Sequence, residues 1–390
     1  MRRVYLDNNA TTPLAPEAFE AMKPFLLDDF GNASSVHAYG QKARAAVEQA
    51  RGRLAGLLNA RPNEIVFTSG GTEADNAALL GMVENARSES KHVVTTVIEH
   101  TAVLHTARAL EKRGVRVTYV RVGPGGVVEP ADIERALRPD TVLISVMHVN
   151  NELGTIQPLE EIGRIARTHD IYFHTDAVQA VGKVPVDVEK LGVDLLSLSA
   201  HKLHGPKGIG ALYIRRGTIL KPWLHGGHDE RDRRPGTENV PGIVGLGMVA
   251  ELARRQLEAE GVRVAALRDR LEAGILQRVP GVRVNGDRGR RLPTTANLCF
   301  DTVEGEALVI ALDLKGVACS TGAACSSGSV EPSHVLVAIG RSPEEARSSV
   351  RFSLGRFTTD DDIAYTLEVL PAVVERFRSV TPHANKPVAP

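Results

Sequence analysis

The chain of 390 residues is 43% hydrophobic and 24% charged, which is typical of an ordinary globular protein of about two or three domains. Lys plus Arg equals Asp plus Glu at 47 each, so no long-range field attracts nucleic acid or an anionic membrane, and we expect neither as a partner. The sequence shows no signal-peptide pattern and no uninterrupted apolar segment of about 18 residues, which predicts a cytoplasmic protein without a membrane span.

Seven strand candidates alternate with helical patterns between about residues 60 and 215. They are rich in Val, Ile and Thr and comprise residues 64–69, 92–100, 116–122, 141–150, 171–177, 194–202 and 209–215. Strands that alternate with helices form crossover units. The pattern therefore predicts an α/β fold with a mostly parallel sheet between helices, in which ligands bind at the carboxyl ends of the strands.

The first of these strands leads into a glycine pair and a helix, in the sequence VFTSGGTEADNAAL. Gly70 and Gly71 allow the backbone to approach a ligand closely, and Thr72 adds a hydroxyl at a helix start whose free N–H groups favour a phosphate. The alternative is an ordinary helix start with Thr72 and Glu73 in its first turn. The lysine that a P-loop requires is absent.

Asp176 ends another strand, in the sequence IYFHTDAVQA, and Gln179 follows three residues later. A carboxylate at the end of a strand, beside the crevice of the sheet, is suited to hold a protonated ring nitrogen by a charge-assisted hydrogen bond. The alternative is an N-cap for the next helix.

Lys202 stands after a strand and before a glycine-rich turn, in the sequence LLSLSAHKLHGPKGIGALYI, together with Ser199 and His201. A lysine at the end of a buried strand is costly unless it is paired or used covalently. Lys207 lies between Pro206 and Gly208, where a solvent-exposed turn is expected. The alternative for Lys202 is a structural lysine at the rim of the sheet.

Together these residues indicate one cofactor. A lysine that bonds an aldehyde, an acid for a pyridine nitrogen and a phosphate site are what proteins use to hold pyridoxal phosphate. His100, at the end of the strand candidate 92–100, is the candidate for a histidine that faces the ring.

A second region follows the sequence RRPGTENVPG. A long helical pattern from about Val244 to Gln277 leads to a mixed segment. We expect residues 15–255 to form a large cofactor-binding domain and residues 256–378 a smaller α+β domain. Residues 1–14 are expected to pack with the small domain, and residues 379–390 to form a flexible tail.

The three cysteines all lie in the last quarter of the chain and form no CxxC pair or zinc spacing. Cys299 and Cys319 stand in apolar contexts that predict buried packing. Cys325 differs, because it lies among small residues in STGAACSSGS, within a connection from Ser320 to about Ser333 that is long enough to signal function or disorder. We expect this loop to be mobile when no substrate or partner is bound.

Motifs along nearly the whole chain resemble the cysteine desulfurases of the iron-sulfur cluster assembly type, within the class-V aminotransferases and fold-type I pyridoxal phosphate enzymes. In chain order the motifs are YLDNNATTP, GNASSVH, FTSGGTEADN, IEHTAV, HVNNELGTIQP, HTDAVQ, SAHKLHGPKGIG, RPGTENV, STGAACSSGS and VRFSLGRFT. The resemblance implies a large domain with a seven-stranded sheet, a smaller C-terminal domain and conversion of L-cysteine to L-alanine.

The resemblance also implies a role for each matching residue. Lys202 corresponds to the lysine bonded to pyridoxal phosphate, Asp176 to the partner of the ring nitrogen, and His100 to the imidazole that stacks on the ring and passes protons. The other implied cofactor ligands are Gly71, Thr72, Asn151, Gln179, Ser199, His201 and Thr237. Asn151 and Arg351 correspond to residues near the substrate carboxylate, where a planar guanidinium suits bidentate recognition.

Two further implications concern partners and sulfur. In the family, the residue matching Thr237 reaches the phosphate of the neighbouring subunit, which implies a homodimer with shared sites. Cys325 corresponds to the thiolate that takes the substrate sulfur as a persulfide and passes it to an acceptor such as an iron-sulfur scaffold. No metal is expected for catalysis, although Cys325 is a candidate transient cluster ligand during transfer.

Three alternatives remain at this point. A selenocysteine lyase would use the same site, because selenium and sulfur substrates differ little in shape. An aminotransferase of the same fold would need the lysine, the acid and the phosphate ligands but not the cysteine loop. A non-catalytic assembly scaffold would not need Lys202, Asp176, His100 and Cys325 together.

Overall fold

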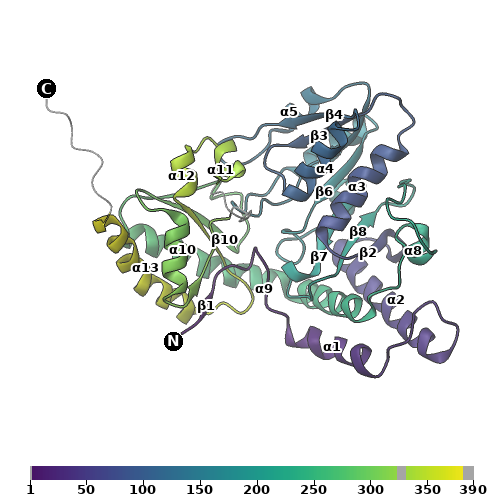
Figure 1. Ribbon diagram of the computed structural model, residues 1–390, viewed down its shortest axis with the longest axis horizontal. Helices are drawn as coiled ribbons and strands as arrows, with labels where there is room; N and C mark the ends of the chain where they lie inside the picture. Colours follow the sequence, from purple (N-terminus) through teal and green to yellow (C-terminus); the bar gives the residue numbers. More distant parts are fainter. Residues whose placement is uncertain (1, 323–330, 381–390) are drawn as a thin grey trace.

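The computed structural model describes residues 2–322 and 331–380, and Figure 1 shows two lobes joined by one long helix. Cys325 and the expected tail beyond residue 380 lie outside the described residues. In the part of the chain that is described, no helix combines the length and apolar character needed to cross a membrane.

The larger lobe contains a seven-stranded sheet made of the seven predicted strands. They are β2 (Ile65–Thr68), β3 (His92–Thr96), β4 (Arg116–Val120), β5 (Thr141–Ser145), β6 (Tyr172–Asp176), β7 (Leu195–Ser199) and β8 (Gly210–Ile214). The spatial order is β2-β8-β7-β6-β5-β3-β4. β8 is antiparallel to β2 and β7, and the other neighbouring pairs in this sheet are parallel, so the predicted mostly parallel sheet is confirmed.

Helices cover both faces of this sheet. Because successive strand residues point to opposite sides, each strand contributes side chains to the core on both faces. The helices before residue 200 are α1 (Pro16–Leu27), α2 (Ala38–Leu58), α3 (Gly71–Asn85), α4 (Thr101–Glu111), α5 (Pro130–Ala136), α6 (Leu159–Thr168) and α7 (Val188–Leu191). Leu196 of β7 packs in a core with α2 and α6, whereas its neighbour Leu195 packs in a second core with α3 and α4. The strands are apolar on both faces for this reason.

The long helix α9 (Val240–Arg278) belongs to both lobes, and it extends slightly beyond the predicted 244–277. Its first half, with Ile243 and Leu246, packs in the core under the large sheet. Its second half, with Leu267 and Leu271, packs in the core of the smaller lobe. A short helix, α8 (Asp229–Asp232), precedes it, and two 3-10 turns, η1 (Pro62–Glu64) and η2 (Ala200–Lys202), flank the large sheet.

The smaller lobe has an antiparallel sheet in the order β12-β10-β9 and several helices. Its elements are β9 (Val282–Val284), β10 (Thr295–Phe300), α10 (Gly305–Asp313), β11 (Val317–Ala318), α11 (His334–Ala338), α12 (Pro343–Arg347), β12 (Ser349–Ser353) and α13 (Asp360–Val380).

The N-terminal segment adds to this lobe. Its strand β1 (Val4–Tyr5) pairs in parallel with β11. Residue Asp7 then forms a bridge with Ser353 at the end of β12. The first residues of the chain therefore lie beside a strand that is more than 340 positions later in the sequence.

Candidate active site

Polar residues converge where the carboxyl ends of β6 and β7 meet the start of α3. Ser199 ends β7 and lies close to the glycine pair, since a Cβ placed on Gly71 would come within 3.7 Å of the Ser199 Cβ. The same Cβ would lie 2.6 Å from Val178 Cγ2, so only glycine fits at Gly71. Gly70 and Gly71 therefore present backbone without side chains of their own where α3 meets β7.

The first turn of α3 has the open character of an anion site. Its N-cap is Gly70, none of the described side chains caps it, and Thr72 and Glu73 lie in its first turn, as the alternative of an ordinary helix start predicts. Glu73 accepts a hydrogen bond from the N–H of Ser69 at 2.7 Å and from Arg234 at 2.8 Å. A helix start with unused N–H groups favours a phosphate.

Asp176 ends β6 with 5% of its surface exposed. Its Oδ1 accepts a hydrogen bond from the N–H of Val178 at 2.9 Å, but turns rather than a helix follow, so the N-cap alternative is not observed. Burial raises the pKa of this carboxyl, and the charges of His100 and Lys202 oppose the rise. A cation beside it would restore the ionised form.

His100 reaches the same place from another element. The strand β3 ends at Thr96, four residues before the predicted end, and His100 is the N-cap of α4. Its Nδ1 accepts a hydrogen bond from the N–H of Ala102 at 3.1 Å, which leaves the proton of the neutral ring on Nε2. Ligand atoms of His100, Asp75 and Asp176 lie within 4.8 Å of one another.

Lys202 lies in the turn that follows β7. Its Nζ donates to the carbonyl oxygens of Asn9 at 2.6 Å and Ala10 at 2.7 Å. Burial and the nearby charge of Arg351 lower the pKa of Lys202 to about 8. Lys207, the other lysine of the same turn, is exposed. The two therefore differ as the sequence predicted.

Gln179 lies in a polar chain that includes a second lysine. Its Nε2 donates to the carbonyl of Asn9 at 2.9 Å, and its Oε1 accepts from Lys183 Nζ at 2.6 Å. Because a carbonyl oxygen can only accept, the contact with Asn9 fixes which end of the Gln179 amide is the donor. Sequence reasoning missed Lys183, although its position four residues after Gln179 was a usable signal.

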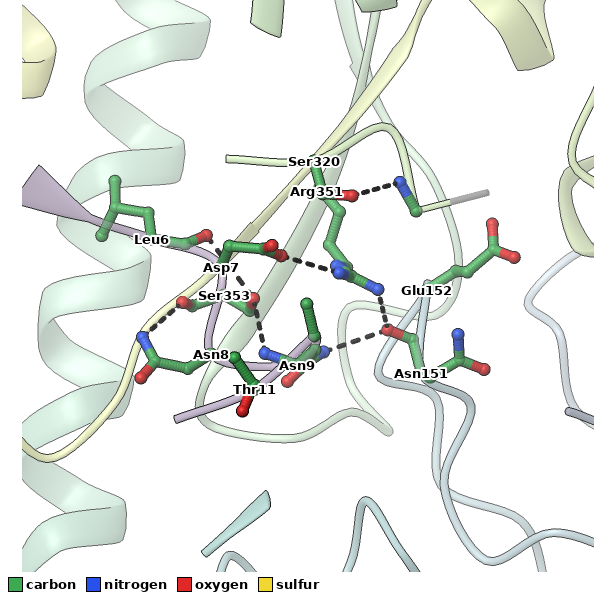
Figure 2. A network of polar contacts seen from close by, with 12 residues as sticks. Leu6, Asp7, Asn8, Asn9, Thr11, Asn151, Glu152, Ser320, Arg351 and Ser353 are labelled. Carbon is green, nitrogen blue, oxygen red and sulfur yellow. Dashed lines mark hydrogen bonds and ion pairs between the residues drawn. The ribbon is translucent and has the colours of Figure 1, made fainter. Parts of the chain in front are cut away.

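Arg351 lies in β12 of the smaller lobe, with 4% of its surface exposed. Its NH1 group donates to the carbonyl of Asn151 at 3.0 Å, and its NH2 group donates to Asp7 Oδ1 at 2.8 Å. The same Asn151 carbonyl accepts from Asn9 Nδ2 at 3.1 Å. Figure 2 shows these residues around one polar network that joins both lobes to the N-terminal segment.

The remaining predicted ligands are divided between the site and the surface. His201 contacts Thr11 Oγ1 through its Nδ1 at 3.1 Å, and burial lowers its pKa to about 4, so the ring is neutral near pH 7. Thr237 is exposed. Its loop is tied to α3 by the pair of Arg234 and Glu73, which places Thr237 on the surface near the start of that helix.

Two of the three cysteines are buried as predicted. Cys299 lies in β10, and Cys319 follows β11. Burial raises the pKa of both thiols, which keeps them protonated and poorly nucleophilic. The expectations for Cys325 and for the mobility of its loop lie outside the described residues.

The residues present fit pyridoxal phosphate. Asp176 offers a buried carboxylate for a protonated ring nitrogen, and Lys202 offers an amine whose neutral form is accessible near pH 8. The start of α3, where only a glycine fits at Gly71, offers N–H groups for a phosphate. Arg351 still has N–H groups for a carboxylate after its two contacts are made.

Comparison with known proteins gives consistent matches over nearly the full length. The profile of the class-V aminotransferase family matches residues 4–365. A cysteine desulfurase IscS from Dictyoglomus turgidum is 52% identical over 385 residues, which cover 99% of this chain and 98% of the relative. A cysteine desulfurase IscS from Methanosarcina thermophila is 51% identical and covers 99% of this chain and 95% of its own length.

Solved structures agree with this. A NifS-like protein superposes with a TM-score of 0.91 at 38% identity, over 96% of this chain and 100% of its own. SspA in complex with cysteine superposes with a TM-score of 0.82 at 40% identity, over 91% of this chain and 100% of its own.

Proposed function

This chain belongs to the class-V aminotransferases and, within them, to the cysteine desulfurases, and on that premise we propose that it removes the sulfur of L-cysteine and releases L-alanine. The observation that carries the residue assignment is the polar network around the nearly buried Arg351: Asn9 and Arg351 both donate to the carbonyl of Asn151, and Lys202 donates to the carbonyl of Asn9. The charge of Asp176, at the end of β6, also acts on the Lys202 amine. A scaffold would have no use for such costly burial.

Pyridoxal phosphate, when bound, supplies an aldehyde for covalent attachment and a ring that accepts electrons. Lys202 would hold it covalently, Asp176 would pair with its ring nitrogen, and Gln179 would donate to its ring hydroxyl. Gly71, Thr72, Ser199 and His201 would hold its phosphate, with Thr237 serving the site of a second copy in a homodimer.

Lys202 has the properties of a base for the substrate α-proton. Its lowered pKa makes a useful fraction of the amine neutral near pH 7 to 8. The carbonyls of Asn9 and Ala10 hold the amine once it carries a proton, because a carbonyl oxygen stabilises an ammonium.

Arg351 and Asn151 would bind the substrate carboxylate. Arg351 is nearly buried and fixed by two protein contacts, so little entropy is lost when a carboxylate binds its remaining N–H groups.

Cys325 would be the sulfur acceptor. Its thiolate would attack the substrate sulfur, so that an S–S bond forms as the C–S bond breaks. The electron pair of the C–S bond stays with the carbon skeleton, which takes up a proton and leaves as L-alanine. His100 would exchange protons in this step through Nε2, because its Nδ1 accepts from the N–H of Ala102. We propose that the resulting persulfide supplies an acceptor such as an iron-sulfur scaffold in the cytoplasm, with Cys325 as a transient cluster ligand.

The test is an assay of purified protein, loaded with pyridoxal phosphate, for alanine and sulfide from L-cysteine with a reductant. Cys325→Ala should keep the visible absorption and lose sulfide release, whereas Cys299→Ala should keep both because Cys299 packs in a strand. Pyruvate or glutamate production that survives Cys325→Ala would instead show transamination. A protein that cannot be loaded with the cofactor would show a scaffold, and a strong preference for L-selenocysteine would show a lyase for that substrate.

A further inference from the structure

The backbone register of the N-terminal segment places Asp7 next to Arg351. Leu6 donates its N–H to the carbonyl of Ala318, and Asn8 donates its N–H to the carbonyl of Ser353 at 3.0 Å. Between them, Asp7 is bridged to Ser353, which is two residues from Arg351 on β12. Residues two apart on a strand point to the same face of the sheet, as Ser353 and Arg351 do on β12. The pairing of Asp7 with Ser353 therefore places the Asp7 carboxylate beside Arg351.

The ion pair between Asp7 and Arg351 is shielded from solvent. Asp7 Oδ1 lies 2.8 Å from Arg351 NH2, and the two side chains are 20% and 4% exposed. By comparison, Asp301 and Arg283 also meet at 2.8 Å, but those side chains are 45% and 48% exposed. Exposed pairs contribute little because water screens them, whereas a shielded pair retains most of its electrostatic interaction.

Asp7 and Asn151 leave the guanidinium only partly occupied. Of its five N–H groups, one is used by the Asp7 carboxylate and one by the Asn151 carbonyl. The Nε of Arg351 is buried and has no hydrogen-bond partner among the described residues. The guanidinium is therefore already held and partly neutralised, with donors remaining for one carboxylate.

We infer that Asp7 determines substrate specificity, because it orients Arg351 for one carboxylate and repels an amino acid that carries a second negative group. This rests on the proposed function, in which Arg351 binds the substrate carboxylate. L-Cysteine with a neutral thiol satisfies both conditions. In L-aspartate a carboxylate replaces the thiol. Asp7 repels this second negative group, and Arg351 attracts it less strongly because its charge is already paired with Asp7.

The charge of Asp7 also affects the Lys202 amine. The carboxylate of Asp7 acts on Lys202, where its charge raises the pKa against the larger lowering effects of burial and Arg351. One acidic side chain thus acts on both cationic groups that would face the substrate.

Two variants separate orientation from charge. Asp7→Asn keeps an oxygen that accepts from Arg351 but removes the negative charge, whereas Asp7→Ala removes both. Asp301→Asn is the matched control, because it removes the same charge from an arginine pair of the same length on the surface. The measurements are KM and kcat for L-cysteine and the inhibition constant of L-aspartate. Spectral titration of the loaded protein with L-aspartate reads binding without turnover.

For Asp7→Asn we expect L-aspartate to bind about tenfold more tightly while KM for L-cysteine changes less than about threefold. For Asp7→Ala we expect KM for L-cysteine to rise about tenfold, with kcat changed less, because Arg351 loses a fixed partner. Asp301→Asn should match the wild type in every measurement.

The inference is overturned if the wild type desulfurates L-cysteine and Asp7→Asn leaves the affinity for L-aspartate unchanged. It is equally overturned if both Asp7 variants raise KM by the same factor. Failure of the wild type to release alanine and sulfide would instead overturn the proposed function.

Discussion

The proposed cofactor half of the site is placed by neighbouring strands of the large sheet, whereas the proposed substrate half is placed where the small sheet, the N-terminal segment and the loop of Asn151 meet. Asp176 and Ser199 end neighbouring strands whose register is fixed along their length. Arg351 and Asn151 meet through side-chain contacts that span both lobes and the N-terminal segment. The positions of the cofactor residues should therefore change little when a neighbouring side chain is substituted. The positions of the substrate residues should depend on each of their hydrogen bonds.

The largest effect should come from the cofactor half. Lys202→Ala removes both the covalent attachment and the proposed base, so we expect turnover to fall by at least about 10³-fold and the visible band of the bound cofactor to shift. Lys207→Ala is the control, because Lys207 is exposed in the same turn. Steady-state kinetics with absorption spectra check this, and substantial turnover in Lys202→Ala would mean that another lysine carries the chemistry.

Arg351→Lys sharpens the comparison in the substrate half. Lysine keeps the charge but cannot contact Asp7 and Asn151 together in the geometry of the guanidinium. We expect KM for L-cysteine to rise about 10- to 100-fold with a smaller change in kcat, as measured by alanine production. Arg283→Lys, on the exposed surface, should have no effect. An unchanged KM would show that Arg351 does not bind the substrate.

The pH dependence of cofactor attachment tests the charge environment of Lys202. Its pKa is lowered to about 8, first by burial and then by Arg351, so the reactive neutral amine becomes dominant above that pH. When pyridoxal phosphate is added to cofactor-free protein, the rate of attachment should rise about tenfold from pH 7 to 9 and then level off. An ordinary lysine would instead show a rate that still increases toward pH 10.

The smallest expected effect concerns the hydrogen bonds that join the halves. Asn9→Ala removes the donor to the Asn151 carbonyl, in partly buried surroundings, and to Thr295 Oγ1 at 3.0 Å, in buried surroundings. We expect the free energy of unfolding to fall by about 1–3 kcal/mol, measured by urea denaturation of the cofactor-free protein. Asn63→Ala, whose side chain is exposed, should change it by less than about 0.5 kcal/mol. Equal stability of both variants would show that these hydrogen bonds do not hold the substrate half.

The same division explains how much could be predicted from the sequence. All seven strands of the large sheet were predicted, because their apolar β-branched runs are local signals. Asp176 and Lys202 followed from them as charged residues at strand ends. The end of β3 was wrong by four residues, because the apolar run continues through Val97 and Ile98, and Ile98 packs against a separate cluster with Met147.

Asp7 and Asn9 could not be identified in this way. Asp7 is 344 residues from Arg351, and only the pairing of β1 with β11 and the bridge to Ser353 bring them together. Hydrogen-bond partners at such separation leave no periodic pattern in the sequence. The resemblance to known desulfurases supplied Arg351 and Asn151, and the structure supplied the residues that hold them.

The most direct test of the central claim is mass spectrometry of the loaded protein after a single turnover with L-cysteine in the absence of reductant. The account predicts one molecule of alanine per site and one added sulfur atom on the peptide that contains Cys325, and neither in Lys202→Ala. Alanine without added sulfur on that peptide would contradict Cys325 as the acceptor, and the absence of alanine from a fully loaded protein would contradict desulfuration itself.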